Sequence, residues 1–383
     1  MAGDKLKRLI SATILSIILL FLSATPSKAL ALDIEAAASI LIDADSGRLL
    51  WEKNSHSRLP PASLTKILTA LVTLEQFDDL TQTFTLPENF VNVGESGIGL
   101  EAGETHTIED LLYALMLRSA NDAGQALALA VAGSESAFAQ MMDLRCVELG
   151  LTDSKWINPH GLHHEEHLSS AYDMAYITRA AMQLPMFNTL ICASSHSIPW
   201  VGNEESIEVV SHNRLLQLYK GADGVKTGYT SKAGNCLVGS ATRNGLRLIG
   251  VVLNSEDTYG QMARLLDYGF ENYELRQVVA FGDVAARLPV INGRANSINA
   301  IFGSNVRILM PKEENKLPQP ELKLPEFLIT PINSQIPLGE AVFDDGLGNS
   351  HHVELFPSGN MESFTLREMI RQAFMQIIQV LLH

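Results

Sequence analysis

The hydrophobic periodicity of this chain changes near residue 278. From Leu32 to about Tyr273, short β-branched runs alternate with longer segments whose apolar residues recur at helical spacing. Beyond Val278 the helical spacing disappears, and eight of the fifteen prolines fall between Pro289 and Pro357. Proline disrupts both helix interiors and strand ladders, so this part is expected to form short strands joined by turns. The sequence predicts a mixed domain over residues 32–277 and a small all-β domain over 278–361.

The mixed domain is predicted to have its strands near its two ends and its helices between them. This order is typical of an α+β architecture in which an antiparallel sheet is backed by a helical cluster. The predicted strands include residues 38–42, 237–241 and 248–253, and the predicted helices include 63–74, 108–117 and 122–131. In the all-β domain, Asn292-Gly293 and Asp345-Gly346 are hairpin-turn dipeptides, and residues 311–325 are expected to form a long connection.

The first 31 residues have the features of an export signal. A basic start precedes an apolar run over residues 9–22, and small residues end at Ala29-Leu30-Ala31. We expect cleavage after Ala31, with Ala29 as the second choice; a retained membrane anchor is the alternative. Either outcome places the bulk of the protein outside the cytoplasm.

Residues 362–383 are predicted to form an amphipathic helix that opens with a capping box, Thr365 and Glu368. The polar residues on one face exclude a membrane span, so a helix lying on the outer face of the cytoplasmic membrane is expected. The alternative is a helix docked on the β domain or on a partner. The apolar face comprises Leu366, Met369, Ile370, Ala373, Phe374, Ile377, Ile378 and Leu381.

Composition narrows the range of partners. The formal net charge of −15 argues against nucleic acid, whose binding requires clustered Lys and Arg.

Cys146, Cys192 and Cys236 have neither disulfide nor zinc spacing and are expected to be buried apolar residues. Four histidines between residues 160 and 167 lack the His-Glu-x-x-His pattern, so a polar surface loop without metal is predicted.

Three short motifs carry the candidate chemistry. They are Ser63-Leu64-Thr65-Lys66, Ser119-Ala120-Asn121 and Lys226-Thr227-Gly228. Each alone has an ordinary explanation as a helix cap, a surface group or an edge strand with a protective lysine. Their combination is what indicates a catalytic site.

Ser63 and Lys66 stand three residues apart at the start of a predicted helix, which places both side chains on one face, about 5–6 Å apart at Cβ. A serine hydroxyl becomes nucleophilic when a neighbouring base takes its proton. Lysine can serve as that base if burial and a nearby cation lower its pKa, and Lys226 could supply the cation. We therefore expect Ser63 to be the nucleophile and Lys66 the general base.

The other two motifs offer groups for proton transfer and substrate binding. Ser119 and Asn121 are predicted to lie on a turn, from which a hydroxyl can relay a proton and an amide can hold the lysine and a substrate carbonyl; Asp122 would cap the following helix equally well. Gly228 lies in a predicted strand and would allow a peptide backbone to approach the sheet edge. Lys226, Thr227 and Thr230 would then face a terminal carboxylate.

This set of motifs resembles the signature of penicillin-binding proteins and serine β-lactamases. The surrounding residues resemble the low-molecular-mass D-alanyl-D-alanine carboxypeptidases of peptidase family S11, from about Ala36 to the C terminus. The segments that carry the resemblance are Pro61-Ala62-Ser63-Leu64-Thr65-Lys66, Leu117-Arg118-Ser119-Ala120-Asn121-Asp122-Ala123, Asn158-Pro159-His160-Gly161-Leu162, Asp223-Gly224-Val225-Lys226-Thr227-Gly228-Tyr229-Thr230 and Tyr268-Gly269-Phe270.

The resemblance implies a β-lactamase/transpeptidase-like fold, no cofactor, covalent β-lactam binding and removal of the terminal D-alanine from peptidoglycan stem peptides. It also implies an oxyanion hole formed by the backbone N–H groups of Ser63 and Tyr229. The implied catalytic residues are Ser63, Lys66, Ser119 and Asn121, and the implied substrate-binding residues are Lys226, Thr227, Gly228, Tyr229 and Thr230.

Two positions depart from the family pattern. Thr258 stands where many relatives have an arginine that helps to hold the substrate carboxylate, which leaves this task to Lys226, Thr227 and Thr230. Ser169-Ser170-Ala171 replaces the usual Ser-Thr-Ala.

Other functions remain open at this stage. A non-catalytic wall-binding protein that retains the fold, a D,D-endopeptidase and a transpeptidase are the alternatives. A β-lactamase is disfavoured because no Glu-x-x-Leu-Asn segment is present to activate water.

Overall fold

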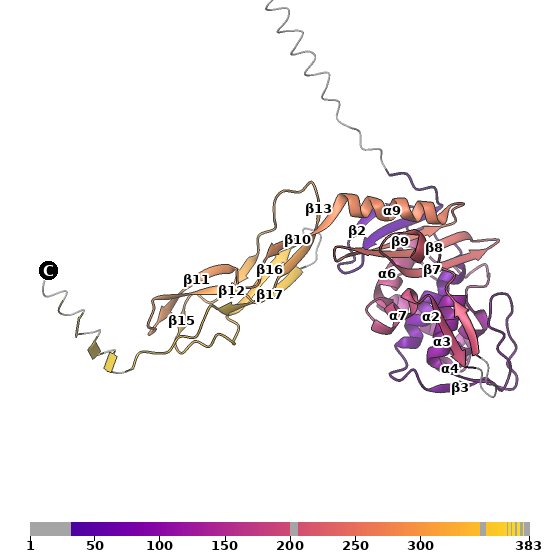
Figure 1. The fold of residues 1–383 in the computed structure, drawn as a ribbon, viewed down its shortest axis with the longest axis horizontal. Coiled ribbons are helices and arrows are strands. Elements are labelled where there is room, and N and C mark those ends of the chain that lie inside the picture. The colour runs from indigo at the N-terminus through magenta and orange to yellow at the C-terminus, as the bar shows by residue number, and fades with distance from the viewer. Residues whose placement is uncertain are drawn as a thin grey trace, which may run out of the picture. The chain divides into compact units, whose positions relative to one another are not determined.

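The computed structural model describes residues 32–199, 206–344 and 350–365, with scattered positions between 367 and 378. A five-stranded antiparallel sheet forms the centre of the mixed domain, which we define as residues 35–272 (Figure 1). Its strand order is β2-β1-β9-β8-β7, so strands from the two ends of the domain pair directly. Their bounds are β1 (Ala38–Asp43), β2 (Leu49–Lys53), β7 (Ala222–Thr230), β8 (Gly234–Arg243) and β9 (Leu246–Leu253).

Helices cover both faces of this sheet. Helix α9 (Thr258–Asn272) packs against β8 and β9 on one face, and all but one of the other helices gather on the opposite face (Figure 1). Residues Thr65–Thr73 of helix α2 are all buried, because α2 lies in the middle of this cluster. The cluster comprises α2 (Thr65–Leu74), α3 (Ile108–Tyr113), α4 (Asn121–Ala132), α5 (Glu135–Glu148), α6 (Ala171–Ala181) and α7 (Pro185–Cys192). The short helix α8 (Leu215–Leu218) lies on the α9 face, where Leu215 and Met262 both pack over Gly239.

Two of the predicted helices differ in detail. The segment expected as one helix from Ser63 to Leu74 begins with a 3-10 turn, η1 (Ala62–Leu64), and becomes α-helical only at Thr65. Ala62 has a φ of 49°, which a continuous α-helix cannot accommodate. The helix expected over residues 108–117 widens into a π-helical turn, η2 (Ala114–Arg118), which ends at Ser119 with a φ of 62°. Each irregular turn adjoins a predicted catalytic serine. π-turns such as η2 are frequent at functional sites.

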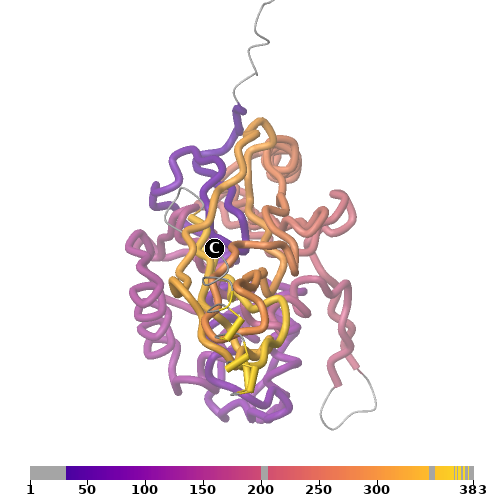
Figure 2. Tube along the Cα trace, turned by 90° about the vertical axis from the view of Figure 1, so that its left-hand side faces the viewer, coloured from indigo at the N-terminus to yellow at the C-terminus, as the bar shows by residue number. Residues whose placement is uncertain are grey.

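Two short hairpins complete the mixed domain. They are β3 (Thr83–Thr85) with β4 (Thr105–Thr107), and β5 (Ser195–Pro199) with β6 (Ser206–Val210). The second hairpin projects from the rest of the domain (Figure 2). The end of β6 leads into His212, which contacts the candidate site described below.

The C-terminal part is all-β, as predicted. A six-stranded sheet has the order β14-β16-β17-β12-β11-β15, and β10 pairs with β13. Asn292 adopts a φ of 61° between the paired strands β11 and β12, which fits its predicted role in a turn. Residues 345–349 lie outside the described residues, although β16 and β17 on either side of them pair. The bounds are β10 (Tyr273–Val279), β11 (Val284–Ile291), β12 (Ser297–Phe302), β13 (Val306–Pro311), β14 (Glu321–Lys323), β15 (Leu328–Ile329), β16 (Gly339–Asp344) and β17 (Ser350–Pro357).

The predicted export signal, residues 1–31, lies outside the described residues. At the other end, the two contacts of the predicted capping box are present: Thr365 N–H donates to Glu368 Oε2 at 2.8 Å, and Glu368 N–H donates to Thr365 Oγ1 at 3.4 Å. Much of the predicted helix beyond them is not described. Among the described residues, no helix is both long and apolar enough to cross a membrane.

Candidate active site

Lys66 connects the predicted catalytic groups. Its Nζ lies 3.1 Å from Ser63 Oγ, 2.7 Å from Asn121 Oδ1 and 2.6 Å from the carbonyl oxygen of His160. A neutral amine has two N–H groups and one lone pair. The two carbonyl oxygens can accept both N–H groups, which leaves the lone pair for the Ser63 hydroxyl. This geometry orients Lys66 as a base.

Electrostatics favour the neutral form of this lysine. Lys66 is completely buried, and its pKa lies well below the usual value of 10.5, first because of desolvation and second because of the charge of Lys226. Asp122 and Glu95 oppose the shift. Burial also lowers the pKa of Lys226, to about 7. The expectation that Lys226 acts on Lys66 agrees with this arrangement.

A loop at residues 158–161 explains the position of Lys66, and sequence reasoning gave it no role at the site. The carbonyl oxygen of His160 accepts from Lys66, and that of Pro159 accepts from Thr69 Oγ1 at 2.5 Å. Gly161 has a φ of 86°, and a Cβ there would come within 1.9 Å of the Ala62 carbonyl oxygen. Only glycine therefore allows this loop to pack against the turn that carries Ser63.

The histidines of this region are not all on the surface, contrary to the prediction. His160 and His167 are 4% and 2% exposed. His167 Nδ1 accepts the Ile157 N–H, and its Nε2 lies 2.8 Å from Thr65 Oγ1, next to the Ser63 turn. Burial lowers the pKa of His167 to about 3, so the ring is a neutral support. In the described part of the chain, no group of His, Cys, Asp or Glu residues could hold a metal ion.

The turn at residues 119–121 supplies the second motif. Helix α4 begins at Asn121, whose side chain contacts Lys66 and also donates from Nδ2 to the Gly94 carbonyl oxygen at 3.1 Å. The alternative role of Asp122 as a helix cap is wrong, because the N-cap position of α4 is Ala120 and no side chain caps it. The Asp122 carboxylate is fully buried and accepts the backbone N–H groups of Ile98, Gly99 and Leu100 at 2.9–3.1 Å. Asp122 thus anchors a loop over the site.

Strand β7 supplies the third motif at the edge of the sheet. Gly228 favours close packing, because a Cβ there would lie only 3.1 Å from the Ser63 nitrogen and 3.2 Å from the Leu64 nitrogen. The backbone that approaches this glycine is therefore the chain's own nucleophile turn. Thr230 Oγ1 accepts the Ala233 N–H at 3.0 Å. Lys226 is only 1% exposed, and its Nζ donates to the carbonyl oxygen of Thr227, a pocket-lining residue, at 3.2 Å.

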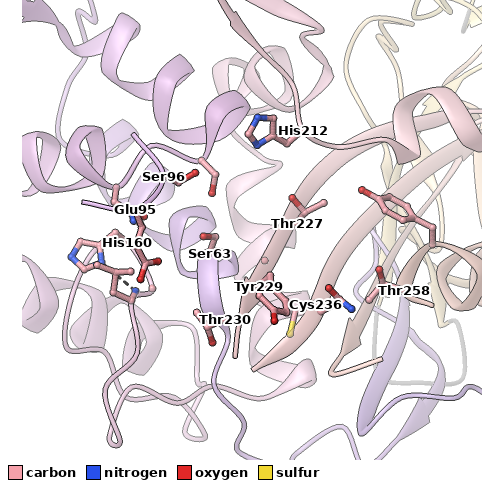
Figure 3. Close-up of a pocket in the computed structure, with 17 residues that line it drawn as sticks. Ser63, Glu95, Ser96, His160, His212, Thr227, Tyr229, Thr230, Cys236 and Thr258 are labelled. Carbon is pink, nitrogen blue, oxygen red and sulfur yellow. Dashed lines mark hydrogen bonds between the residues drawn. The ribbon is translucent and has the colours of Figure 1, made fainter. Parts of the chain in front are cut away.

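These elements enclose one pocket, with Ser63 in the middle, Glu95 and His160 on one side, and Thr227, Tyr229 and Cys236 on the other (Figure 3). Seven predicted site residues line it, and Lys66 and Lys226 lie buried outside the lining. The seven are Ser63, Ser119, Asn121, Thr227, Gly228, Tyr229 and Thr230.

Sequence reasoning did not identify several other lining residues. His160 lies in a segment that resembles the family but carries no predicted role, and Glu95, Ser96, His212, Asn235 and Tyr259 belong to no motif that would reveal them. Thr258 also lines the pocket, at the first residue of α9.

The cysteines follow the prediction in two cases of three. Cys146 and Cys236 are buried, and burial raises the pKa of the Cys236 thiol to about 11, so this pocket-lining group is an inert thiol. Cys192 is exposed at the end of α7, where its Sγ donates to the Asp223 carbonyl oxygen. Its expected burial was wrong: Leu190 and Ile191 take the buried positions of the last turn of that short helix, and Cys192 lies on the exposed side.

A buried, neutral lysine placed against a serine in an α+β fold defines a serine acyltransferase or hydrolase of the penicillin-binding class. Comparison with known families agrees with this assignment. Residues 23–257 match the D-alanyl-D-alanine carboxypeptidase family, peptidase S11, and residues 273–362 match the C-terminal domain of penicillin-binding protein 5. The chain belongs to the peptidase S11 family of D-alanyl-D-alanine carboxypeptidases.

Individual relatives support the family assignment over most of the chain. The D-alanyl-D-alanine carboxypeptidase DacF of Bacillus subtilis is 32% identical over 351 residues, which is 88% of this chain and 90% of DacF. Penicillin-binding protein 3 of Streptococcus pneumoniae superposes with a TM-score of 0.74 at 26% identity, covering 86% of this chain and all of that structure. Penicillin-binding protein 5 of Haemophilus influenzae gives 0.65 at 28% identity, covering 87% and 99%. The predicted family and fold class are confirmed, apart from the C-terminal helix.

Proposed function

We propose that this chain is a serine D-alanyl-D-alanine carboxypeptidase that removes the terminal D-alanine from peptidoglycan stem peptides through an acyl-enzyme on Ser63. The observation that carries the proposal is the environment of Lys66: fully buried, held by two carbonyl oxygens, and 3.1 Å from Ser63 Oγ. A lysine in this state can accept the serine proton at neutral pH.

Acylation would follow from this arrangement. Lys66 takes the Ser63 proton as Oγ attacks the carbonyl carbon of the penultimate D-alanine. The oxyanion is stabilised by the backbone N–H groups of Ser63 and Tyr229. The C–N bond then breaks, and the proton passes from Lys66, with Ser119 as relay, to the nitrogen of the departing D-alanine.

In deacylation, Ser63 Oγ becomes the leaving group and water becomes the nucleophile. Water replaces the D-alanine, Lys66 accepts a water proton, and the hydroxyl attacks the ester carbonyl carbon. The ester C–O bond breaks, Ser63 recovers its proton, and the peptide leaves one residue shorter. The same lysine serves both steps, in keeping with microscopic reversibility.

A fluorescent penicillin tests the nucleophile, since β-lactams bind this family covalently. We expect wild-type protein to be labelled and Ser63→Ala to remain unlabelled. We also expect wild-type protein to release D-alanine from diacetyl-Lys-D-Ala-D-Ala. A folded wild-type protein that is neither labelled nor active would favour the non-catalytic wall-binding alternative, and cleavage only of cross-linked peptides would favour a D,D-endopeptidase.

The location of the enzyme is also part of the proposal. Residues 1–31 have the composition of a cleaved export signal, and the tail beyond residue 362 has one apolar and one polar face. We propose that the mature protein lies on the outer face of the cytoplasmic membrane and contacts it through this tail. The substrate occurs in the same compartment.

A further inference from the structure

The proposed substrate ends in a free carboxylate, and the described lining of the pocket contains no lysine or arginine side chain. Glu95 is an acid, and Lys226 is buried with its Nζ directed to the Thr227 carbonyl oxygen. Thr258 offers only a hydroxyl. A carboxylate that leaves water needs charged or hydrogen-bonding partners. The hydroxyls of Thr227 and Thr230 line the pocket but carry no charge, so a positive charge has to come from another group.

His212 lines the pocket and connects it to a cation. Arg118 Nη1 lies 2.9 Å from His212 Nε2. A guanidinium group can only donate, so Nε2 accepts and the ring proton stays on Nδ1. Among the described residues, Nδ1 has no hydrogen-bond partner and Arg118 has no carboxylate partner. The ring therefore keeps one free N–H donor, polarised by an uncompensated positive charge.

The backbone holds this pair next to the catalytic turn. His212 N–H donates to the Leu117 carbonyl oxygen at 3.1 Å, and Arg118 immediately precedes Ser119. Figure 3 shows His212 on the pocket wall near Thr227. Burial, and then the charges of Arg118 and Lys226, lower the pKa of His212, so the ring remains a neutral donor.

Another arginine close in sequence provides a control. Arg214 stacks on the Tyr259 ring, with its Cζ 5.6 Å from the ring centroid, and it is not part of the pocket lining. Its replacement removes the same charge two residues from His212 without touching the Arg118–His212 pair.

We propose that the Arg118–His212 pair recognises the C-terminal carboxylate of the substrate. His212 donates its Nδ1–H to the carboxylate, and Arg118 is a positioning residue that fixes the tautomer and adds positive charge. This inference rests on the carboxypeptidase function proposed above. The cation in this chain is Arg118, which lies on a different segment from Thr258, the position at which many relatives have an arginine.

The test compares two soluble peptides, diacetyl-Lys-D-Ala-D-Ala and its C-terminal amide, which lacks the charge. Steady-state kinetics are measured for wild type, Arg118→Gln, His212→Phe, Arg118→Lys and Arg214→Gln. We expect Arg118→Gln and His212→Phe to lower kcat/KM for the acid about tenfold, mainly through KM, with little change for the amide. Arg118→Lys should recover part of the loss, and Arg214→Gln, which also loses its contact with the pocket-lining Tyr259, should keep the wild-type ratio of acid to amide kcat/KM.

Labelling by saturating fluorescent penicillin verifies that each variant retains a working Ser63. An unchanged acid-to-amide ratio in both Arg118→Gln and His212→Phe would overturn the inference and leave the carboxypeptidase function intact. An equal loss for acid and amide would also overturn it, because a general structural role would then account for the effect. Failure of the wild type to release D-alanine would instead overturn the proposed function, and this inference with it.

Discussion

At the scale of single residues, the chemistry depends on a lysine that is kept uncharged. Lys66 is buried, and two carbonyl oxygens take its N–H groups, so the free lone pair faces Ser63. The same burial would be unfavourable for a charged lysine. The site thus uses desolvation to turn a residue that is ordinarily a cation into a base.

The charge of Lys226 has a testable effect on the pH dependence of acylation. Lys66 must be unprotonated to accept the serine proton, so acylation rises as pH increases through its lowered pKa and is lost below it. Lys226 has a pKa of about 7 and is charged on the acid side of that value. Replacing Lys226 with Gln should raise the pKa of Lys66 and move the acid limb to higher pH.

The measurement is the second-order rate constant for labelling by a fluorescent penicillin as a function of pH. The pH at the midpoint of the acid limb is read separately from the maximal rate constant, since Lys226→Gln is also expected to weaken binding. Lys232→Gln, at an exposed position, is the charge-matched control. Identical limbs for wild type and Lys226→Gln would show that Lys226 does not act on Lys66 through charge.

At the scale of elements, the site is held by contacts between helix starts and loops. Asp122, in the first turn of α4, binds three backbone N–H groups of the loop that carries Glu95 and Ser96. Gly97 lies so close that a Cβ there would come within 2.6 Å of Asp122 Oδ2. The start of helix α4 therefore positions two parts of the site: Asn121 itself, and, through Asp122, the loop that forms one wall of the pocket.

Removing the Asp122 carboxylate should loosen this loop. In Asp122→Ala, the N–H groups of Ile98, Gly99 and Leu100 lose their acceptor, and we expect the free energy of unfolding to fall by about 3 kcal/mol. Urea unfolding measures the stability, and limited proteolysis near Gly97 measures the loop. Asp45→Asn, at an exposed position, should change neither. Wild-type stability and protease resistance in Asp122→Ala would contradict this role.

At the scale of the whole molecule, the proposed membrane contact depends on the tail. The described side chains of Ile370 and Phe374 are each 63% exposed, as expected of an apolar face without a protein partner. Deletion of residues 364–383 should release the mature protein from vesicles of phosphatidylethanolamine and phosphatidylglycerol. Turnover of a soluble peptide should stay unchanged, because the tail contributes no residue to the described pocket lining.

A point variant tests whether the apolar face itself, rather than the tail as a whole, makes the membrane contact. Phe374→Asp should weaken vesicle sedimentation, and Arg371→Gln on the polar face should have a much smaller effect. Equal sedimentation of the full-length and truncated proteins, with the export signal removed in both, would rule out the tail as the membrane contact.

Much of the architecture was predictable because its signals are local. Apolar spacing marked the α2 helix and the sheet strands, and the loss of helical periodicity marked the all-β part. The three-residue spacing brought Ser63 and Lys66 together, although Ser63 lies in the 3-10 turn η1 and only Lys66 lies in α2. The irregular turns at Ala62 and Ser119 were missed, because neither residue type by itself favours a positive φ; at Ala62 the turn packs against the distant Gly161 and Gly228.

The sequence by itself determined the order of the elements, the family and the serine–lysine pair, since each depends on residues close in the chain or on motifs that can be read directly. Only the tertiary structure decided which groups complete the site. Lys66 meets the His160 carbonyl across 94 residues, and Arg118 meets His212 across the same separation. Such contacts depend on how the whole core packs, and no periodic pattern or short motif encodes them.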